Sequence, residues 1–295
     1  MPSLAITRAA NAAWNPTYTP VGVFVGGTSG IGQGIVEAFA RHTKGNAHIL
    51  IVGRNRAAAT AILDRLPKPP ASTNTPEPTR EFLHCDLSLI ANAKRTAASI
   101  AIRFPRVNVV FLTAGEISLK GLDVGDEGVD RQMSALYYSK WAFIDELLPC
   151  LRAAVAAGED ARVAAVHTAG RGGPIDLDDL GLMKAMGGGI AGVRKLLPQM
   201  ASYQDLMAEV GSSAVLRVVH YARYLLFPTF IFRAMSIADC GEYQLYALLQ
   251  ARPGASRAGG GGGDIGMGGE GDANWGEEQR LLWAHSEKVV SAVVV

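Results

Sequence analysis

The sequence predicts an α/β fold in which one doubly wound, mostly parallel sheet is flanked by helices. Short, largely apolar runs at residues 21–25, 47–52 and 107–112 are typical of strands that helices cover on both faces. Segments with the apolar spacing of helices separate these runs, which is the alternation expected when helices connect parallel strands. With 295 residues, of which 48% are hydrophobic, the chain suits one large domain with a full core.

The first apolar run breaks at a glycine-rich turn that opens directly into a helix reaching Ala40. Glycine lets the backbone turn tightly and approach a ligand closely, and the N–H groups at the start of the helix then face an anion. Strand, turn and helix in this order are typical of Rossmann-like nucleotide-binding folds, so the turn predicts a pyrophosphate site. The residues expected to bind the cofactor here are Gly26, Thr28, Ser29, Gly30, Ile31 and Gly32.

The end of the second strand carries two arginines, in the segment Arg54, Asn55 and Arg56. In nucleotide-binding α/β folds this position faces the adenosine ribose, where an acidic residue accepts the 2′-hydroxyl and an arginine accommodates a 2′-phosphate. The pair therefore favours NADP(H) over NAD(H). The alternative is that both arginines are solvated charges at the start of a helix.

Two further motifs follow strands in the order that a known family shows. Asp86 and Leu87 come after a strand at residues 81–85, and Thr113, Ala114 and Gly115 come after the strand at residues 107–112. Together with the glycine turn they resemble the short-chain dehydrogenase/reductase superfamily. The resemblance implies that Asp86 and Leu87 lie beside the adenine ring and that residues 113–115 lie beneath the nicotinamide ribose. Asp86 is equally suited to capping the next helix.

The long helix expected at residues 127–144 and the segment 240–249 are similar to a divergent, largely fungal branch of the superfamily. The family resemblance implies a catalytic tyrosine with a lysine four residues later, on the same helix face, and a serine that binds the carbonyl group. In this chain no tyrosine has a lysine four residues later. The cofactor half of the pattern is therefore complete, whereas the catalytic half departs from it.

The catalytic positions are inferred by counting from the neighbouring strands. The serine position falls near His167 or Thr168, and the position that usually holds asparagine falls near Leu136. Counting forward from a fifth strand, expected at residues 161–167, reaches Lys184. Counting backward from a sixth strand, expected at residues 215–220, reaches Lys195, which we prefer because residues 176–192 resemble an inserted loop.

Two groups are candidates to replace the missing proton donor, so the catalytic set is Lys195, His167, Thr168 and Tyr138. His167 has a ring that titrates near neutral pH, and Tyr138 lies with Tyr137 near the nicotinamide side of the long helix. The alternative for both is a structural role within the core.

Composition excludes several other classes of function. The net charge of +1 gives no electrostatic case for nucleic acid. The three cysteines are widely spaced and form no metal-binding motif, so we expect free thiols, no metal and a cytoplasmic location. The most apolar run, residues 224–232, is too short to cross a membrane. It lies in the segment 221–235, whose composition fits the wall of a pocket for a small lipophilic substrate, or core packing or a subunit contact.

The expected domain organisation has four parts. Residues 1–20 form an irregular arm, residues 21–250 the Rossmann-like nucleotide-binding and catalytic domain, residues 251–274 a flexible glycine-rich segment, and residues 275–295 a C-terminal helix and tail.

The sequence thus predicts an NADP(H)-dependent oxidoreductase of the short-chain type, acting on a small lipophilic carbonyl or alcohol in secondary metabolism with a non-standard proton donor. The alternative is a member that binds nucleotide without redox turnover, either an isomerase- or cyclase-type enzyme or an inactive binding subunit. The resemblance also implies a homo-oligomer.

Overall fold

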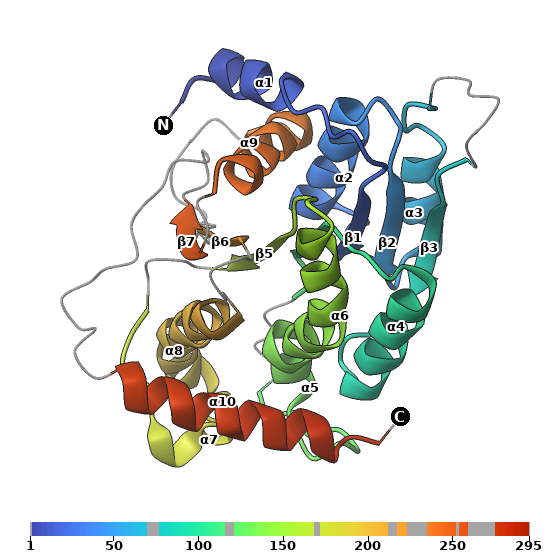
Figure 1. Ribbon diagram of the computed structural model, residues 1–295. Coiled ribbons are helices and arrows are strands. Elements are labelled where there is room, and N and C mark those ends of the chain that lie inside the picture. Colours follow the sequence, from blue (N-terminus) through green and yellow to red (C-terminus); the bar gives the residue numbers. More distant parts are fainter. Residues whose placement is uncertain are drawn as a thin grey trace.

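The computed structural model describes residues 2–69, 77–115, 121–167, 172–211, 217–222, 235–251, 254–258 and 275–294. These residues form one sheet between two layers of helices (Figure 1). The sheet has seven strands in the order β3-β2-β1-β4-β5-β6-β7, and every pairing between them is parallel. The predicted doubly wound α/β fold is confirmed.

The strands are β1 (Val21–Val25), β2 (His48–Gly53), β3 (Arg80–His84), β4 (Val109–Leu112), β5 (Arg162–His167), β6 (Arg217–Ala222) and β7 (Gly254–Ala258). The helices are α1 (Leu4–Ala12), α2 (Gly30–His42), α3 (Arg56–Leu63), α4 (Ile90–Arg103), α5 (Arg131–Met133), α6 (Ser139–Ala156), α7 (Met183–Gly187), α8 (Gly189–Gly211), α9 (Ile237–Gln250) and α10 (Trp275–Ala292). A π-helical segment, η1 (Ser134–Tyr138), joins α5 to α6, and a short 3₁₀ helix, η2 (Leu177–Asp179), precedes α7.

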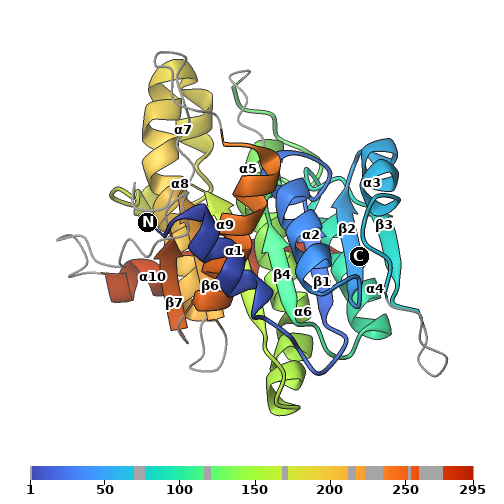
Figure 2. The same ribbon diagram turned by 90° about the horizontal axis from the view of Figure 1, so that it is seen from above.

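Alternate residues of each central strand enter two separate hydrophobic clusters, one on each face of the sheet. In β1, Val23 and Val25 pack with α4, α6, α8 and α10, whereas Phe24 packs with α2, α3 and α9. Both clusters are buried, which explains why the strands are apolar throughout rather than alternating. The core is therefore a three-layer structure, with α10 lying outside α8 on one side (Figures 1 and 2).

The N-terminal arm differs from the sequence expectation, because residues 4–12 form helix α1 instead of irregular backbone. Ser3 caps this helix by accepting a hydrogen bond from the N–H of Ile6. Helix α1 lies along α9, where Asn11 donates to the Glu242 carboxylate at 2.8 Å. These partners are more than 200 residues away in the chain, so local sequence spacing gave no sign of them.

The prediction of an inserted loop at residues 176–192 is also wrong, because this segment forms η2, α7 and the start of α8. The Asp179 carboxylate accepts hydrogen bonds from the N–H groups of Lys184 and Ala185 and so caps α7. Gly192 lies against the carbonyl of Ala185, where a side chain would collide with it. The glycines that suggested a loop instead allow two helices to pack closely.

The segment 251–274, expected to be flexible, contains strand β7, which continues the sheet beyond β6. Residues 254–258 lack the branched and aromatic side chains that mark strands, so backbone pairing with β6 specifies this one. The glycine tract at residues 259–271 lies outside the described residues. Helix α10 (Trp275–Ala292) is the expected C-terminal helix and extends two residues into the expected tail.

Candidate cofactor and active site

The glycine turn packs directly on the end of β4. Gly26 has a φ of +89°, and a side chain there would come within 2.6 Å of the Thr113 hydroxyl oxygen and the Ala114 nitrogen. Thr113 donates through its hydroxyl to the carbonyl of Gly26 at 3.0 Å. Gly32 also lies against the Thr113 hydroxyl, at 2.6 Å from where a side chain would begin. The turn can therefore take this shape only with glycine at positions 26 and 32.

The start of α2 is arranged to receive an anion. Ser29 occupies the N-cap position in extended conformation, and its side chain makes no capping hydrogen bond. The first N–H groups of a helix have no partner within the helix, so those of Gly30, Ile31 and Gly32 remain available to a phosphate. Gly30 has a φ of +54° and open space around it, which leaves room for a ligand.

The arginine segment adjoins the glycine turn at the end of β2. Thr28 lies 3.5 Å from where a side chain at Gly53 would begin, which places the end of β2 beside the turn. Asn55 caps α3 by accepting from the N–H of Ala58 at 3.0 Å, and the Arg56 guanidinium lies 5.0 Å from the centre of the Phe82 ring. Arg54 is exposed. Asn55 and Arg56 are exposed as well, so all three side chains reach solvent at this edge.

The Asp86 side chain makes a local hydrogen bond but does not cap the helix that follows, so the capping alternative is wrong. Its Oδ1 accepts from the N–H of Ser88 at 3.0 Å. The start of α4 is capped from elsewhere, because the Glu127 carboxylate accepts from the N–H groups of Ile90 and Ala91 at 2.6 and 2.9 Å. Leu87 is buried, and its carbonyl accepts hydrogen bonds from Ser134 and Ser139. These contacts fix η1 against the start of α4.

The segment 113–115 ends against η1. Gly115 has a φ of +152°, and a side chain there would come 2.6 Å from the Leu136 Cδ2 atom. Leu136 thus lies beside the part of the predicted cofactor site that would bind the nicotinamide, at the position where the family pattern has asparagine. The Gln204 side-chain amide, from α8, donates to the Leu136 carbonyl at 2.6 Å. A polar residue of α8 therefore stabilises the π-helical turn at this edge.

Three buried ionisable groups lie at the end of β5. His167 Nε2 lies 3.9 Å from Asp205 Oδ1, an ion-pair distance, and the two side chains are 7% and 1% exposed. Lys140, 2% exposed, donates through Nζ to the Val166 carbonyl at 3.5 Å. Burial lowers the pKa of Lys140 to about 8, so its ammonium loses a proton much more readily than that of an exposed lysine. The strand end thus brings together an acid, an imidazole and a lysine.

The other predicted catalytic residues are not gathered at this point. Lys195 is exposed and lies ten residues before Asp205 on α8, about 15 Å away along the helix axis. Tyr138 is 1% exposed, and its hydroxyl bonds to His285 Nε2 of α10 at 2.8 Å. Thr168 lies outside the described residues. Of the four, His167 is the one seen at the edge where the cofactor motifs meet.

Sequence reasoning missed Lys140, Gln204 and Asp205. Lys140 lies in the helix 127–144 that is similar to the fungal branch, and no spacing rule assigns it a role there. Gln204 and Asp205 are polar residues facing the core from a helix with buried apolar neighbours, and that mismatch was the available signal. Their partners are 38 or more residues away, which spacing along the chain cannot reveal.

Among the described residues, no group of three or more His, Cys, Asp or Glu side chains could hold a metal ion. In the same part of the chain, no helix is both long enough and apolar enough to span a membrane.

Comparison with known sequences finds relatives that are named as oxidoreductases. No family model matches the chain. The chain is 34% identical over 182 residues to Oxidoreductase AN1596 of Emericella nidulans, covering 62% of this chain and 52% of that protein. It is 31% identical over 167 residues to Short-chain dehydrogenase/reductase SAT2 of Stachybotrys chartarum, covering 52% of this chain and 46% of that protein. The chain thus spans about half the length of the curated relatives it matches.

Solved structures of similar fold include short-chain oxidoreductases. An uncharacterised protein from Mycobacterium paratuberculosis superposes with a TM-score of 0.67 at 18% identity, covering 95% of this chain and 97% of that one. A metagenomic short-chain oxidoreductase in complex with NADP superposes with a TM-score of 0.55 at 16% identity, covering 82% and 97%. At these identities the likeness establishes the fold alone.

Proposed function

We propose that this chain is a short-chain dehydrogenase/reductase-type oxidoreductase that uses NADP(H). The observation that supports it best is the contiguous edge in which the glycine turn, the end of β2 and residues 113–115 pack on one another. That edge combines a helix N-terminus free to bind phosphate with an exposed arginine at the ribose position. The names of the fungal relatives point to the same class of reaction.

The cofactor would be held by residues of the three motifs together. The N–H groups of residues 30–32 would bind the pyrophosphate, Arg54 the 2′-phosphate, and residues 113–115 the nicotinamide ribose. When bound, the nicotinamide supplies hydride transfer. The chain's own task is then to orient the substrate carbonyl and to move one proton.

We propose that His167 transfers this proton. In the reductive direction, its imidazolium gives a proton to the carbonyl oxygen while the carbonyl carbon receives hydride, so that an alcohol leaves. Asp205 Oδ1 lies 3.9 Å from His167 Nε2, within ion-pair distance, and would orient the ring. Thr168 is proposed to bind the carbonyl. The exposure of Lys195 and the contact of Tyr138 with α10 leave both with weaker support as catalytic groups.

The proposed substrate is a small lipophilic carbonyl or alcohol of fungal secondary metabolism. Most of the segment expected to line its pocket, residues 223–234, lies outside the described residues. None of the three cysteines Cys85, Cys150 and Cys240 forms a disulfide bond, which fits a cytoplasmic location. A homo-oligomer stays a prediction from the family resemblance.

A second candidate function is nucleotide binding without redox turnover. Its specific support is the replacement of the family's polar site residues, with Leu136 against Gly115 and the Tyr138 hydroxyl bonded to α10. The two functions differ in one measurement. The oxidoreductase consumes NADPH in the presence of one or more lipophilic ketones, aldehydes or imines, whereas the non-redox protein binds NADPH and consumes none with the whole panel.

Cofactor preference is tested by Arg54→Ala. We expect wild type to bind NADPH more tightly than NADH. The variant should lose about tenfold or more of its affinity for NADPH and none for NADH, because a hydrogen bond to a charged group contributes about 1.5–3 kcal/mol. Arg152→Ala, which removes another exposed arginine, is the control. An Arg54→Ala variant that keeps the wild-type preference would contradict the assignment. Dissociation constants from fluorescence titration provide the readout.

A further inference from the structure

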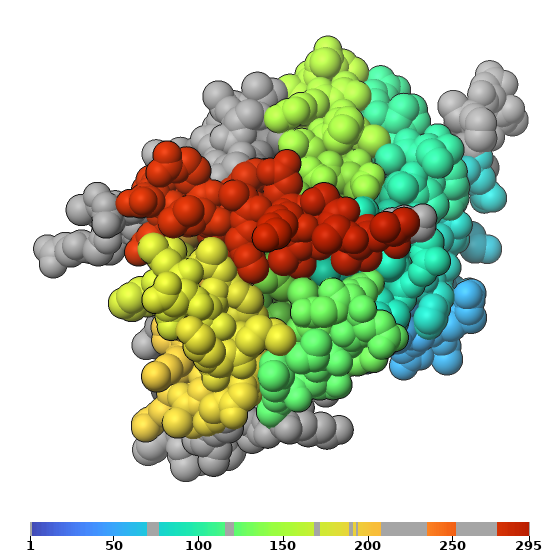
Figure 3. All heavy atoms as spheres, turned by 90° about the horizontal axis from the view of Figure 1, so that it is seen from below, coloured from blue at the N-terminus to red at the C-terminus, as the bar shows by residue number. Residues whose placement is uncertain are grey.

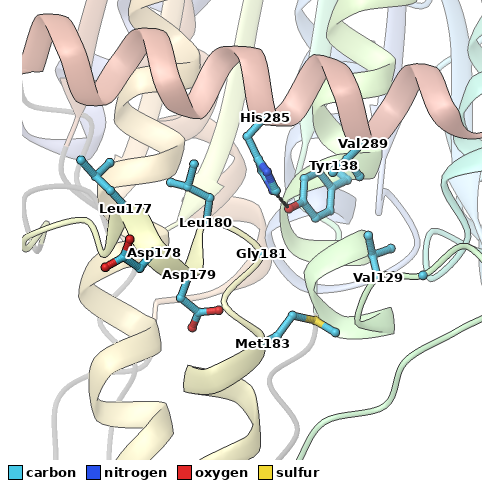
Figure 4. A pocket seen from close by; sticks show the side chains of 11 residues that line it. Val129, Tyr138, Leu177, Asp178, Asp179, Leu180, Gly181, Met183, His285 and Val289 are labelled. Atoms are coloured by element: carbon cyan, nitrogen blue, oxygen red, sulfur yellow. Dashed lines mark hydrogen bonds between the residues drawn. The ribbon is translucent and has the colours of Figure 1, made fainter.

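A pocket of about 430 Å³ lies between η1, residues 177–183 and α10 (Figure 4). In the view from below, α10 runs across this face of the molecule (Figure 3). The volume falls within the range of about 300–1,000 Å³ that is usual for small-ligand pockets. Apolar side chains form much of the wall, namely Val129, Leu177, Leu180, Met183 and Val289.

This pocket is separate from the cofactor edge. Leu136 faces Gly115 at that edge, whereas Tyr138 bonds to His285 of α10 and lines the pocket. Side chains two residues apart leave a helix on nearly opposite sides, so η1 lies between the two sites. A molecule in the pocket would therefore contact neither the glycine turn nor residues 113–115.

The pocket wall is held in place by hydrogen bonds behind it. Tyr137 bonds to Ser286 at 3.0 Å and so ties η1 to α10 a second time. Tyr203 donates to the Leu180 carbonyl at 3.1 Å and fixes the opposite wall. Both tyrosines are almost fully buried and their rings are 5.4 Å apart. A preformed cavity of this kind binds a ligand without a large ordering cost.

The charges at the pocket favour a cation. Two carboxylates, Asp178 and Asp179, are among its lining residues, and no lysine or arginine is. Asp179 is committed to capping α7, whereas Asp178 is exposed. Burial and the charge of Lys288 lower the pKa of His285, so that its ring is neutral near pH 7 and does not repel a cation. Lys184 Nζ donates to the Asp178 backbone carbonyl at 3.1 Å.

We propose that this pocket is a second small-molecule site that binds an apolar amine. The hydrocarbon part lies among the aliphatic side chains, the ammonium pairs with Asp178, and the Tyr138–His285 pair provides a further polar contact. The site does not depend on the proposed redox function, because it uses none of the cofactor residues.

Calorimetric titration with 2-phenylethylamine, 2-phenylethanol and 3-phenylpropanoate at pH 7 tests the proposal. The amine is expected to bind about tenfold more tightly than the alcohol, and the carboxylate least, as for a hydrogen bond to a charged group. Asp178→Asn should abolish the advantage of the amine. Glu287→Gln, which removes an exposed carboxylate of α10 outside the pocket, should preserve it.

A second variant tests the location without relying on charge. Val289→Trp fills the pocket and should prevent binding of both the amine and the alcohol, whereas Leu281→Trp, at an exposed position of α10, should bind both like wild type. The proposal is overturned if wild type binds the amine no better than the alcohol. It is equally overturned if Asp178→Asn retains the amine preference, or if Val289→Trp binds the amine as wild type does.

Discussion

At the scale of single residues, the end of β5 holds polar groups whose burial needs a function or a compensating contact. The side chains of His167 and Asp205 are 7% and 1% exposed. Lys140 as a whole residue is 2% exposed. Burial of ionisable groups costs free energy, and such groups are concentrated at functional sites. This cost is the physical reason to assign the proton step here rather than to exposed Lys195.

If His167 moves the proton, His167→Asn should lower kcat by about 10²–10⁴-fold, the usual contribution of a general acid or base. NADPH should still bind with its wild-type dissociation constant, because the His167 imidazole is not one of the residues proposed to bind the cofactor. The measurement pairs turnover of the best panel substrate with an NADPH titration. His84→Asn, at an exposed histidine of β3, is the matched control, and equal kcat values for all three proteins would rule out the assignment.

Lys140 makes a prediction about stability and pH. Its pKa is about 8 in the folded protein and that of an ordinary lysine when unfolded, so the unfolded chain binds more protons between these values. The charged lysine therefore destabilises the fold below pH 8, and the cost disappears as the pH rises toward about 10.4.

Lys140→Met should accordingly raise the free energy of unfolding by up to about 3 kcal/mol at pH 7, with a gain that shrinks steadily between pH 8 and 10. Urea denaturation of variant and wild type at several pH values measures this difference. Lys195→Met, at an exposed lysine, should give a small difference that does not change with pH. A gain for Lys140→Met that is constant with pH would contradict the buried-charge account.

At the scale of elements, Glu242 joins three helices. Its carboxylate, 3% exposed, accepts hydrogen bonds from Asn11 of α1 and contacts Arg41 and His42 of α2, while its own helix is α9. Burial acts to raise the pKa of Glu242, but the hydrogen bonds from His42 and Asn11 and the two positive charges outweigh it and lower the pKa to about 2.

Because that pKa is depressed, the contribution of Glu242 to stability is fully present above about pH 4.3 and is lost as the pH falls toward 2. Glu242→Gln should lower the free energy of unfolding at pH 7 by about 3 kcal/mol, as for removal of one partner from a buried ion pair. The deficit should shrink between pH 4 and 2. Glu287→Gln, at an exposed site, should change stability little at either pH, and denaturation curves with the same pattern for both variants would refute this role.

At the scale of the whole molecule, the sheet and the cofactor edge could be predicted from local sequence. The contacts between residues far apart in the chain could be found only in the folded structure. A buried parallel strand such as β1 and a turn with glycine at positions 26 and 32 are set by residues adjacent in sequence, so their pattern is readable. Asp205 meets His167 and His285 meets Tyr138 only through packing of distant helices. Strand β7 and helix α1 were missed for the same reason, since their partners are remote.

The central claim is that the glycine turn forms a nucleotide site, and NADPH titration of wild type and Gly32→Val tests it most directly. A side chain at position 32 would collide with the Gly26 carbonyl and lie 2.6 Å from the Thr113 hydroxyl, so the turn must open. We predict that wild type binds one NADPH, that Gly32→Val binds none, and that Gly276→Ala, which has open space around it, binds like wild type. No binding to wild type, or unchanged binding to Gly32→Val, would contradict the account.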